Sequence, residues 1–394
     1  MREEDLHRLL TVATEDVRPT RPAATGWERA RRVRRARRAA GTTALAVALL
    51  AGGTALALRP ADRPPPAATV TPQVSRTPHP VPVRTPPAEL AYPGHPLGRL
   101  GDPVGAALSD RPVRRALALH QPVDPGTGVA GRIRVLGDDG VVRDLDVVTP
   151  APTRDAEGNE AVPLKSGSLS PDGRTAAFAQ TDEVIVVDLT TAAVRRHPLK
   201  GYLEQVLWAG DRLLVGDDDT TYELDRATGV ARKLPVSPWD AVAPDPAAPP
   251  NVPLELGGTP PNLTAVVQWT DDETHRSYGA VDFRALPPGH RVDEFYGRGW
   301  QRGERVARAG WITTGTMGGL EGVAVLNART RVVTHLLDLG RDRWKGCCEV
   351  LGWDSDGSVL LRHNPGGLLR WQPETGEVTG VTRNLFGAVS LAAG

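Results

Sequence analysis

Closely spaced acidic residues are the first candidates for chemistry in this sequence. Asp354-x-Asp356-Gly357 has the form of the opening of a calcium-binding loop, in which alternating carboxylates supply oxygen ligands. The glutamate expected at the twelfth position of such a loop is missing, because Pro365 stands there. A plain β-turn is therefore the favoured interpretation of this segment, and calcium binding is the alternative.

A second acidic cluster consists of three consecutive residues, Asp217 to Asp219. These carboxylates could form a metal-binding rim, but consecutive acids on a connection between strands are more often solvated. We predict no cofactor and leave a metal ion undecided. The candidate metal ligands are Asp217, Asp219, Asp354 and Asp356.

Tryptophan is unusually frequent, with nine Trp against four Phe. An indole ring can pack in a core, or its face can stack on a sugar or a peptide. Four tryptophans fall where the first strand of a repeated unit is expected, and core packing is the favoured role for them. The alternative is an aromatic floor that binds a ligand on one face of the fold, formed by Trp208, Trp239, Trp300 and Trp353.

The only two cysteines, Cys347 and Cys348, are adjacent. Two cysteines exclude both a disulfide framework and a zinc site built from four cysteines. A bridge between neighbours strains the backbone, because a trans peptide holds the Cα atoms about 3.8 Å apart, whereas disulfides usually span about 4.4–6.8 Å. A vicinal disulfide, two buried free thiols and an intermolecular bridge all remain open.

Motifs of well-known catalytic sites are absent from the sequence. It contains no His-Glu-x-x-His, no Gly-x-Ser-x-Gly, no P-loop and no Gly-x-Gly-x-x-Gly after an expected strand. Outside the proline-rich segment the histidines are scattered. We therefore favour a role other than catalysis, although an enzyme whose acids and histidines meet in space remains an alternative.

An uncharged stretch of 20 residues, 39–58, lies between Arg38 and Arg59. A helix of this length crosses about 30 Å of hydrocarbon. Seven arginines and no acid between positions 29 and 38 precede it, and positive flanks stay inside. We predict a single-pass protein of the cell membrane, with residues 1–38 cytoplasmic and the C-terminal domain extracellular. A cleaved signal peptide is the alternative.

The charge distribution argues against a nucleic-acid partner. The chain has 47 basic and 47 acidic residues, and its basic excess is confined to residues 1–58, where 11 Arg face six acids. The arginine run has no interleaved aromatic residues and lies where lipid headgroups would neutralise it. Arginine also outnumbers lysine 43 to four, which is typical of a high-GC genome and suggests an actinobacterium.

Residues 59–96 contain 12 prolines in 38 positions. Such a segment favours polyproline II at about 3.1 Å per residue, which predicts a stiff stalk. Residues 1–38 contain one short amphipathic helical pattern, which is marginal alone in water. This layout resembles the membrane-bound anti-sigma factors of actinobacteria and implies a transmembrane regulator. His7 stands without the cysteines of that family's zinc motif, so this role remains an alternative.

The rest of the chain, residues 97–394, alternates short apolar runs with Asp-Gly, Thr-Gly and Pro turns and shows no helical pattern. This predicts an all-β domain. A hairpin recurs six times, and the turn anchors of its last five copies are 37, 57, 45 and 45 residues apart. Spacings of about 40–45 residues are typical of propellers with four strands per blade. The six copies are 132–148, 184–199, 221–236, 279–295, 323–339 and 368–382.

The phrase SLSPDGRTAAFA at 168–179, followed by a strand ending in Val187-Asp188-Leu189, resembles TolB-like and WD40-like propellers. The resemblance implies only the fold. The last segment, 385–394, is expected to be the missing strand of the first blade and to close a ring of six blades. Seven blades is the alternative, if residues 88–112 or 237–261 contain another.

These patterns together predict a membrane-anchored extracellular propeller that acts as a binding or scaffold module. The expected partners are the membrane, through residues 39–58, and a protein or cell-wall glycan on the propeller face. The alternatives are a lactonase-like or lyase-like propeller enzyme and an anti-sigma-like regulator.

Overall fold

The computed structural model describes residues 81–217, 220–236, 238–247, 254–257, 265–269, 276–340, 348–363 and 366–394. Within these ranges the regular structure is β-strand, apart from the 3-10 helix η1 (Pro96–Gly101). The all-β prediction is therefore confirmed. None of the described residues form a helix long and apolar enough to cross a membrane. The predicted tail 1–38 and span 39–58 lie outside them.

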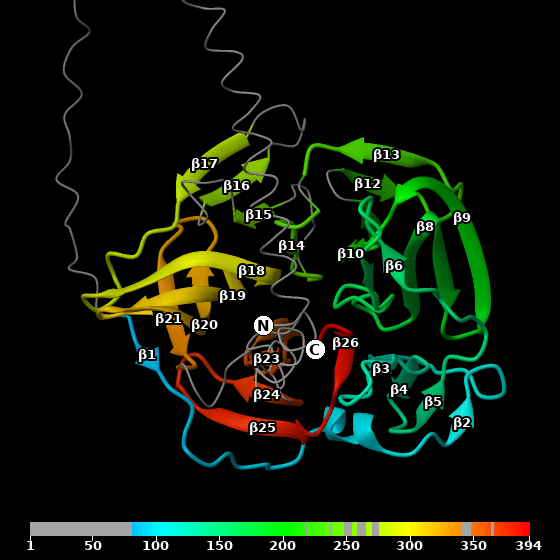
Figure 1. The fold of residues 1–394 in the computed structure, drawn as a ribbon, viewed down its shortest axis with the longest axis horizontal. Helices are drawn as coiled ribbons and strands as arrows, with labels where there is room; N and C mark the ends of the chain where they lie inside the picture. Colours follow the sequence, from blue (N-terminus) through cyan, green and yellow to red (C-terminus); the bar gives the residue numbers. More distant parts are fainter. Residues whose placement is uncertain are drawn as a thin grey trace, which may run out of the picture.

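The strands form sheets that follow one another around a central axis, which is the arrangement of a β-propeller (Figure 1). The C-terminus lies at the centre of this ring. In order around the ring, the first two sheets are β2 (Ala106–Ala107), β5 (Val142–Asp144), β4 (Arg134–Gly137), β3 (Ala116–Pro122) and β26 (Gly387–Leu391), and then β8 (Thr175–Asp188) and β9 (Ala193–Tyr202), with the hairpin β6 (Thr153–Arg154) and β7 (Glu160–Ala161). The next two sheets are β10 (Gln205–Ala209), β11 (Arg212–Gly216), β12 (Thr221–Leu224) and β13 (Ala231–Leu234), and then β15 (Leu254–Gly257), β16 (Ala265–Trp269) and β17 (Arg276–Ala280). The last two sheets are β14 (Val242–Ala243), β18 (His290–Arg302), β19 (Arg305–Thr314), β20 (Met317–Asn327), β21 (Val333–Asp338) and β1 (Val83–Arg84), and then β22 (Glu349–Trp353), β23 (Val359–Arg362), β24 (Gly367–Trp371) and β25 (Val378–Arg383).

Strand β8 contains a chain reversal, so it supplies two neighbouring strands rather than one. Asp182 in its middle has a φ of 62°, and the Leu189 amide donates a 2.9 Å hydrogen bond to Arg174 O at its start. Leu169 forms a bridge with Ala176 across the Ser-Pro-Asp-Gly turn. The segment that carries the resemblance to TolB-like and WD40-like propellers therefore forms consecutive antiparallel strands.

Five of the six predicted hairpins are antiparallel strand pairs: β4–β5, the second half of β8 with β9, β12–β13, β20–β21 and β24–β25. The hairpin predicted over 279–295 is wrong. Strand β17 ends at Ala280 in one sheet, and β18 begins at His290 in the next. Between them Pro287 and Pro288 lack the N–H groups that a ladder needs, and the His290 amide closes a turn on Pro287 O at 3.1 Å.

The last strand closes the ring, as the sequence predicts. Strand β26 runs antiparallel to β3 from Gly387 opposite Pro122 to Leu391 opposite Ala118. The fully buried Ser390 connects this pair to the following sheet, because its hydroxyl accepts from the Leu169 amide and donates to Ser166 O, both at 2.8 Å. The C-terminal strand thus completes the sheet that contains β3, β4 and β5.

The core lies between neighbouring sheets. One cluster joins Val325 and Leu337 of the β18–β21 sheet to Val350, Leu361 and Trp371 of the next sheet, all less than 1% exposed. Strand β20 packs apolar side chains on both faces, because Val323 and Val325 belong to this cluster and Ala324 and Leu326 belong to the cluster on its other side.

Part of the predicted stalk, 59–96, lies on the propeller. Val83 in β1 pairs in parallel with Leu336 in β21, and the Gly380 amide of β25 donates a 2.8 Å hydrogen bond to Ala91 O. Residues 81–96 are therefore packed on the propeller, whose predicted start was residue 97, because Val81, Val83 and Leu90 add apolar contacts that the proline content hides. Residues 59–80 lie outside the described part.

Ring closure can be tested by truncating the chain after Phe386, which removes β26. The truncated protein should aggregate or lose cooperative unfolding, because β3 then exposes an unpaired edge and the sheet ends separate. Solubility and a thermal melt of the detergent-purified chain measure this. Truncation after Leu391 keeps every β26–β3 pair and should still give a folded protein. A folded, heat-stable protein ending at Phe386 would contradict the prediction.

The closing strand pair also contains a buried histidine. His120 on β3 is 3% exposed, and its Nε2 lies 2.9 Å from Phe386 O. That carbonyl can only accept, so Nε2 carries the proton, and the buried Nδ1 has no hydrogen-bond partner among the described residues. Burial, with Arg134 and Arg362 adding to it, lowers the pKa of His120 from 6.5 to about 4.

The stability of the closed ring should therefore depend on pH. Between pH 6.5 and about 4 the unfolded chain binds a proton that the folded protein excludes, so the free energy of unfolding falls as the pH falls. We expect a loss of about 2–3 kcal/mol from this group between pH 7.5 and 4.5. His120→Gln should flatten this slope in chemical denaturation, whereas His290→Gln should not. Identical slopes for His120→Gln and wild type would contradict the assignment.

Candidate functional site

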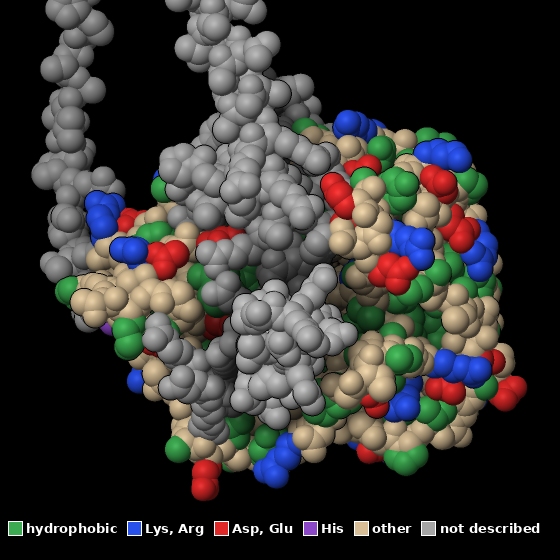
Figure 2. All heavy atoms as spheres, viewed as in Figure 1, with side chains coloured by type: hydrophobic (Ala, Val, Ile, Leu, Met, Phe, Trp, Pro, Cys, Tyr) green, Lys and Arg blue, Asp and Glu red, His purple; other side chains and the backbone are tan. Residues whose placement is uncertain are grey.

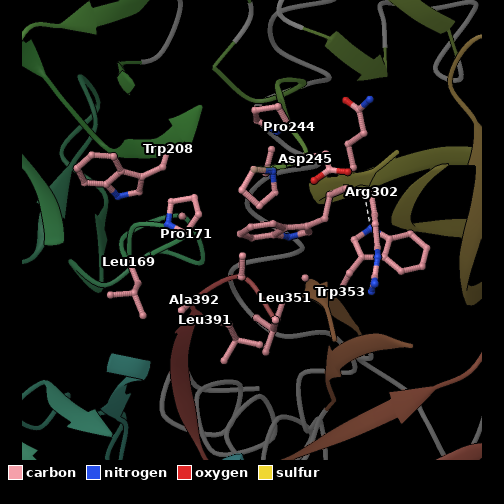
Figure 3. Close-up of a pocket in the computed structure, with 18 of the residues that line it drawn as sticks. Leu169, Pro171, Trp208, Pro244, Asp245, Arg302, Leu351, Trp353, Leu391 and Ala392 are labelled. Atoms are coloured by element: carbon pink, nitrogen blue, oxygen red, sulfur yellow. Dashed lines mark hydrogen bonds between the residues drawn. The ribbon is translucent and has the colours of Figure 1, made fainter. Parts of the chain in front are cut away.

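A cavity of about 200 Å³ lies on the axis of the propeller, where the innermost segments of the sheets meet. We call it the axial cavity. Figure 3 shows its labelled side chains converging on one space from separate strands. The segments that line it are Gly167–Pro171, Leu207 and Trp208, Ala243–Ala247, Trp300–Arg302, Leu351–Trp353 and Leu391–Gly394.

Three of the four candidate tryptophans, Trp208, Trp300 and Trp353, line the axial cavity. Trp208 belongs to β10, Trp300 to β18 and Trp353 to β22. Trp208 and Trp353 come from the edge strands β10 and β22 of their sheets, and Trp300 comes from β18, which is flanked on that side by the two-residue strand β14. The sequence correctly assigned these residues to first strands, and the ring brings them together.

The indole N–H groups of these tryptophans hydrogen-bond to neighbouring sheets. Trp208 donates to Ser168 O at 3.1 Å, Trp300 donates to Val350 O at 2.8 Å, and Trp353 donates to Trp300 O at 2.8 Å. These bonds orient the rings and satisfy their polar atoms. The indoles therefore present apolar surface to the cavity, with their N–H groups already used.

The remaining wall is largely apolar. Leu169, Leu207, Leu351 and Leu391 are at most 5% exposed, and Pro171, Pro244 and Pro246 stand at its edge. Figure 2 shows hydrophobic side chains at the bottom of a hollow near the centre, with charged side chains on the surrounding surface. The site combines a buried apolar floor with a polar rim.

Two arginines stack against the tryptophan rings. The guanidinium carbon of Arg226 lies 5.0 Å from the ring centre of Trp208, and that of Arg305 lies 5.1 Å from the ring centre of Trp353. Each contact is within the range of a cation–π interaction. These contacts cover part of each indole and help to hold the ring in place.

The polar side chains of the cavity are Asp245, Gln301 and Arg302, and all make internal hydrogen bonds. Asp245 accepts from the amides of Gly303 (2.5 Å) and Ala247 (2.8 Å). Gln301 donates to Gly303 O at 2.8 Å. Arg302 donates to Asp354 O and, at 2.6 Å, to Ser355 O. These bonds hold the rim of the cavity together.

The groups that line the cavity are mainly apolar. Among the described residues that line the cavity, Asp245 is the one with a carboxylate side chain, and none is a histidine or a cysteine. General acid–base catalysis needs a proton donor and acceptor aimed at the same substrate atoms. An apolar cavity with few polar groups instead favours the uptake of an apolar group.

The fourth candidate, Trp239, lies close to the cavity segments in the chain but not among the residues that line the cavity. It is half-buried, and its carbonyl accepts a 3.1 Å hydrogen bond from the buried Arg308. Trp239 lies in the turn before β14. Of the four candidates, the tryptophans that line the cavity are therefore Trp208, Trp300 and Trp353.

The segment that contains Asp354 and Asp356 forms a β-turn, with the Gly357 amide donating to Asp354 O at 3.0 Å. Both carboxylates contact the Arg370 guanidinium, and Asp354 also lies 3.1 Å from His95 Nε2. The hydrogen bond from His95 is the main cause that lowers the pKa of Asp354 to about 2. These acids therefore form an ion-pair network at the turn.

The other metal candidates are Asp217 and Asp219. Asp217 accepts a 2.6 Å hydrogen bond from the Thr220 amide, and Asp219 lies outside the described residues. Within the described part of the chain, no three His, Cys, Asp or Glu side chains gather closely enough to hold a metal ion.

Cys348 is buried beside Tyr296 and is disulfide-bonded. Its amide donates to the Tyr296 hydroxyl at 3.3 Å, and the Tyr296 ring lies 5.2 Å from that of Trp311. Cys347, the other cysteine of the sequence, lies outside the described residues, so the vicinal bridge stays a prediction.

Sequence reasoning missed the polar rim and the proline edge of the cavity. Arg302 follows Trp300 by two positions, and Asp245 lies between Pro244 and Pro246 in the proline-rich insert. Nothing in their local pattern distinguishes them from ordinary loop residues. The signal available was their position at the end of a strand, because Arg302 is the last residue of β18 and Asp245 follows β14 by two positions.

No protein-family model and no curated protein matches the sequence. The chain is similar in structure to TolB from Acinetobacter baumannii, with 14% identity, 69% of this chain and 65% of that chain covered, and a TM-score of 0.48. It is also similar to the WD40 β-propeller domain of Doa1, with 11% identity, 68% of this chain and 87% of that chain covered, and a TM-score of 0.41. A third similar structure is virginiamycin B lyase from Staphylococcus aureus, with 8% identity, 68% of this chain and 85% of that chain covered, and a TM-score of 0.37. The chain thus spans just under two thirds of the TolB chain, and these similarities concern the fold alone.

Proposed function

We propose that this chain is a single-pass membrane protein whose extracellular six-bladed propeller binds a protein ligand by taking one of its apolar side chains into the axial cavity. The observation that carries the proposal is the convergence of Trp208, Trp300 and Trp353 on that cavity. Aromatic residues in a pocket at the centre of a surface are typical of the hot spots that anchor protein partners.

The size of the cavity supports a side chain as its occupant. About 200 Å³ is smaller than the roughly 300–1,000 Å³ of pockets that enclose whole small molecules. One large apolar side chain fits such a volume, while the rest of the partner would lie across the turns of the propeller face. The charged turns around the hollow would then form the polar rim of the interface.

A protein ligand is favoured over a glycan because of the polar groups of the site. Sugars are held by several directed hydrogen bonds in addition to stacking on a ring, and here all three indole N–H groups donate to backbone carbonyls. Binding a sugar would require breaking these bonds or using the rim groups of Asp245, Gln301 and Arg302 alone. A glycan is therefore kept as an outcome of the binding test.

Membrane anchoring rests on the sequence. The uncharged residues 39–58, the seven preceding arginines and the proline-rich stalk support a propeller held outside the membrane by its N-terminus. The stalk would allow the cavity to reach a partner at some distance from the lipid.

Blocking the axial cavity should abolish binding. We expect the detergent-purified full-length chain to bind N-acetyltryptophanamide or N-acetylleucinamide, as detected by saturation-transfer NMR. Ala392→Phe adds a ring to the cavity wall and should weaken binding at least about tenfold, because the ring occupies the ligand's space. Ala156→Phe, at an exposed position of the β6–β7 turn that is not among the residues lining the cavity, is the matched control.

Two results would contradict the proposed function. Equal binding by wild type and Ala392→Phe would place the probes elsewhere on the protein. Binding of an N-acetylglucosamine trimer, with no binding of either amino-acid amide, would identify a glycan site instead.

The predicted membrane topology can be tested with engineered cysteines. Ser75→Cys and Asp110→Cys should react with an impermeant thiol reagent on intact cells, because both positions follow the predicted span. Thr20→Cys should react only after the membrane is permeabilised. Protection of both outer positions in intact cells would overturn the topology.

A further inference from the structure

Residues 81–107 form a strap around the outside of the propeller. Strand β1 pairs in parallel with β21, Ala91 accepts from β25, and β2 pairs in parallel with β5. Figure 1 shows the strap running along the outer rim past β25 to β2. It therefore crosses the outer strands β21, β25 and β5 of three successive sheets. The last of these sheets contains β26.

The strap is fixed at Tyr92 and His95. The Tyr92 ring lies against Gly380, where an added Cβ atom would clash with it, and the Arg383 guanidinium carbon lies over the ring, 4.0 Å from its centre. His95 Nε2 lies 3.1 Å from Asp354 Oδ2, and the two side chains are only 17% and 18% exposed. His95 is thus the point at which the strap contacts the turn after β22.

The hydrogen bonds of His95 determine its tautomer. The Leu97 amide donates to His95 Nδ1 at 3.2 Å, so Nδ1 is an acceptor. The proton is therefore on Nε2, which donates to the Asp354 carboxylate. A neutral imidazole is sufficient for both bonds, and the second is a hydrogen bond to an ionised acceptor, which is stronger than one between neutral groups.

Asp354 connects the strap to the wall of the axial cavity. It directly follows Trp353, and its amide and carbonyl bond to Ser358 O and the Gly357 amide at 2.8 and 3.0 Å. Arg302, a rim residue, donates to the carbonyls of Asp354 and Ser355. A displacement of this turn would therefore move both the Trp353 ring and the Arg302 side chain.

We propose that His95 is a positioning residue of the axial cavity, which holds Trp353 in its binding orientation through Asp354, and that the strap is consequently part of the binding unit. This inference rests on the proposed function of the cavity. It also explains why a histidine in a proline-rich segment is paired with a half-buried carboxylate 259 positions away.

The test uses the full-length protein in detergent micelles, with hydrogen–deuterium exchange and the affinity for N-acetyltryptophanamide as readouts. His95→Ala should speed amide exchange at 353–358 by about tenfold and weaken the probe about three- to tenfold, as expected for the loss of one charge-assisted hydrogen bond. His95→Gln retains a donor and should recover most of both effects. His290→Ala is the matched histidine control and should change neither.

A double-mutant cycle gives a second measurement. If His95 acts through Asp354, then Asp354→Asn and His95→Ala together should weaken the probe by less than the product of the single effects. A purely structural role of His95 would lower the melting temperature without this coupling and without rescue by glutamine.

Three results would overturn the proposal: wild-type exchange at 353–358 in His95→Ala, faster exchange confined to residues 81–97, or equal effects of the Ala and Gln variants. If the wild-type protein binds no probe, the proposed function of the cavity fails separately. The exchange measurements then decide by themselves whether His95 holds the Trp353 turn.

Discussion

The pairing of β26 with β3 is the constraint on which the rest of the structure depends. Separate sheets placed around an axis expose unpaired edges and apolar faces unless the first and last of them share strands. Here that shared sheet is also joined to the next one by the buried hydroxyl of Ser390. Once the ring is closed, every innermost strand must end near the same axis, and the position of the axial cavity follows.

The cavity and the joints between sheets are built from the same residues. The indole N–H groups of Trp208, Trp300 and Trp353 each bond to a carbonyl of an adjoining sheet, so the rings that face the cavity also connect the sheets. Core packing and ligand binding, which are alternatives for these tryptophans at the level of sequence, are compatible in the structure. A ring edge can be buried between sheets while part of its face borders the axis.

Sequence patterns predicted the strands and hairpins better than the contacts between segments that are distant in the chain. Alternating apolar residues and Asp-rich turns identified five hairpins and the closing strand, because strand period and turn chemistry are local properties. The hairpin predicted over 279–295 was wrong, because its two apolar runs have the alternation of paired strands but belong to different sheets. The prolines between them mark the connection from one sheet to the next. Three cavity tryptophans were found from their strand position, whereas Asp245, Arg302 and the strap contact of His95 with Asp354 depend on pairings between distant segments that no local pattern encodes.

The distribution of charge explains why the cavity can be specific without a charged floor. Its ionisable rim groups are engaged in the turns, with Asp245 holding two amides and Arg302 two carbonyls, so they shape the entrance. A polar ligand group entering the cavity would lose its water and find no free donor on the three indoles, a cost of a few kcal/mol. An apolar side chain gains free energy by leaving water and has no hydrogen bonds to replace. In the proposed function, selection would therefore rest on the shape and polarity of the one side chain that enters the axial cavity.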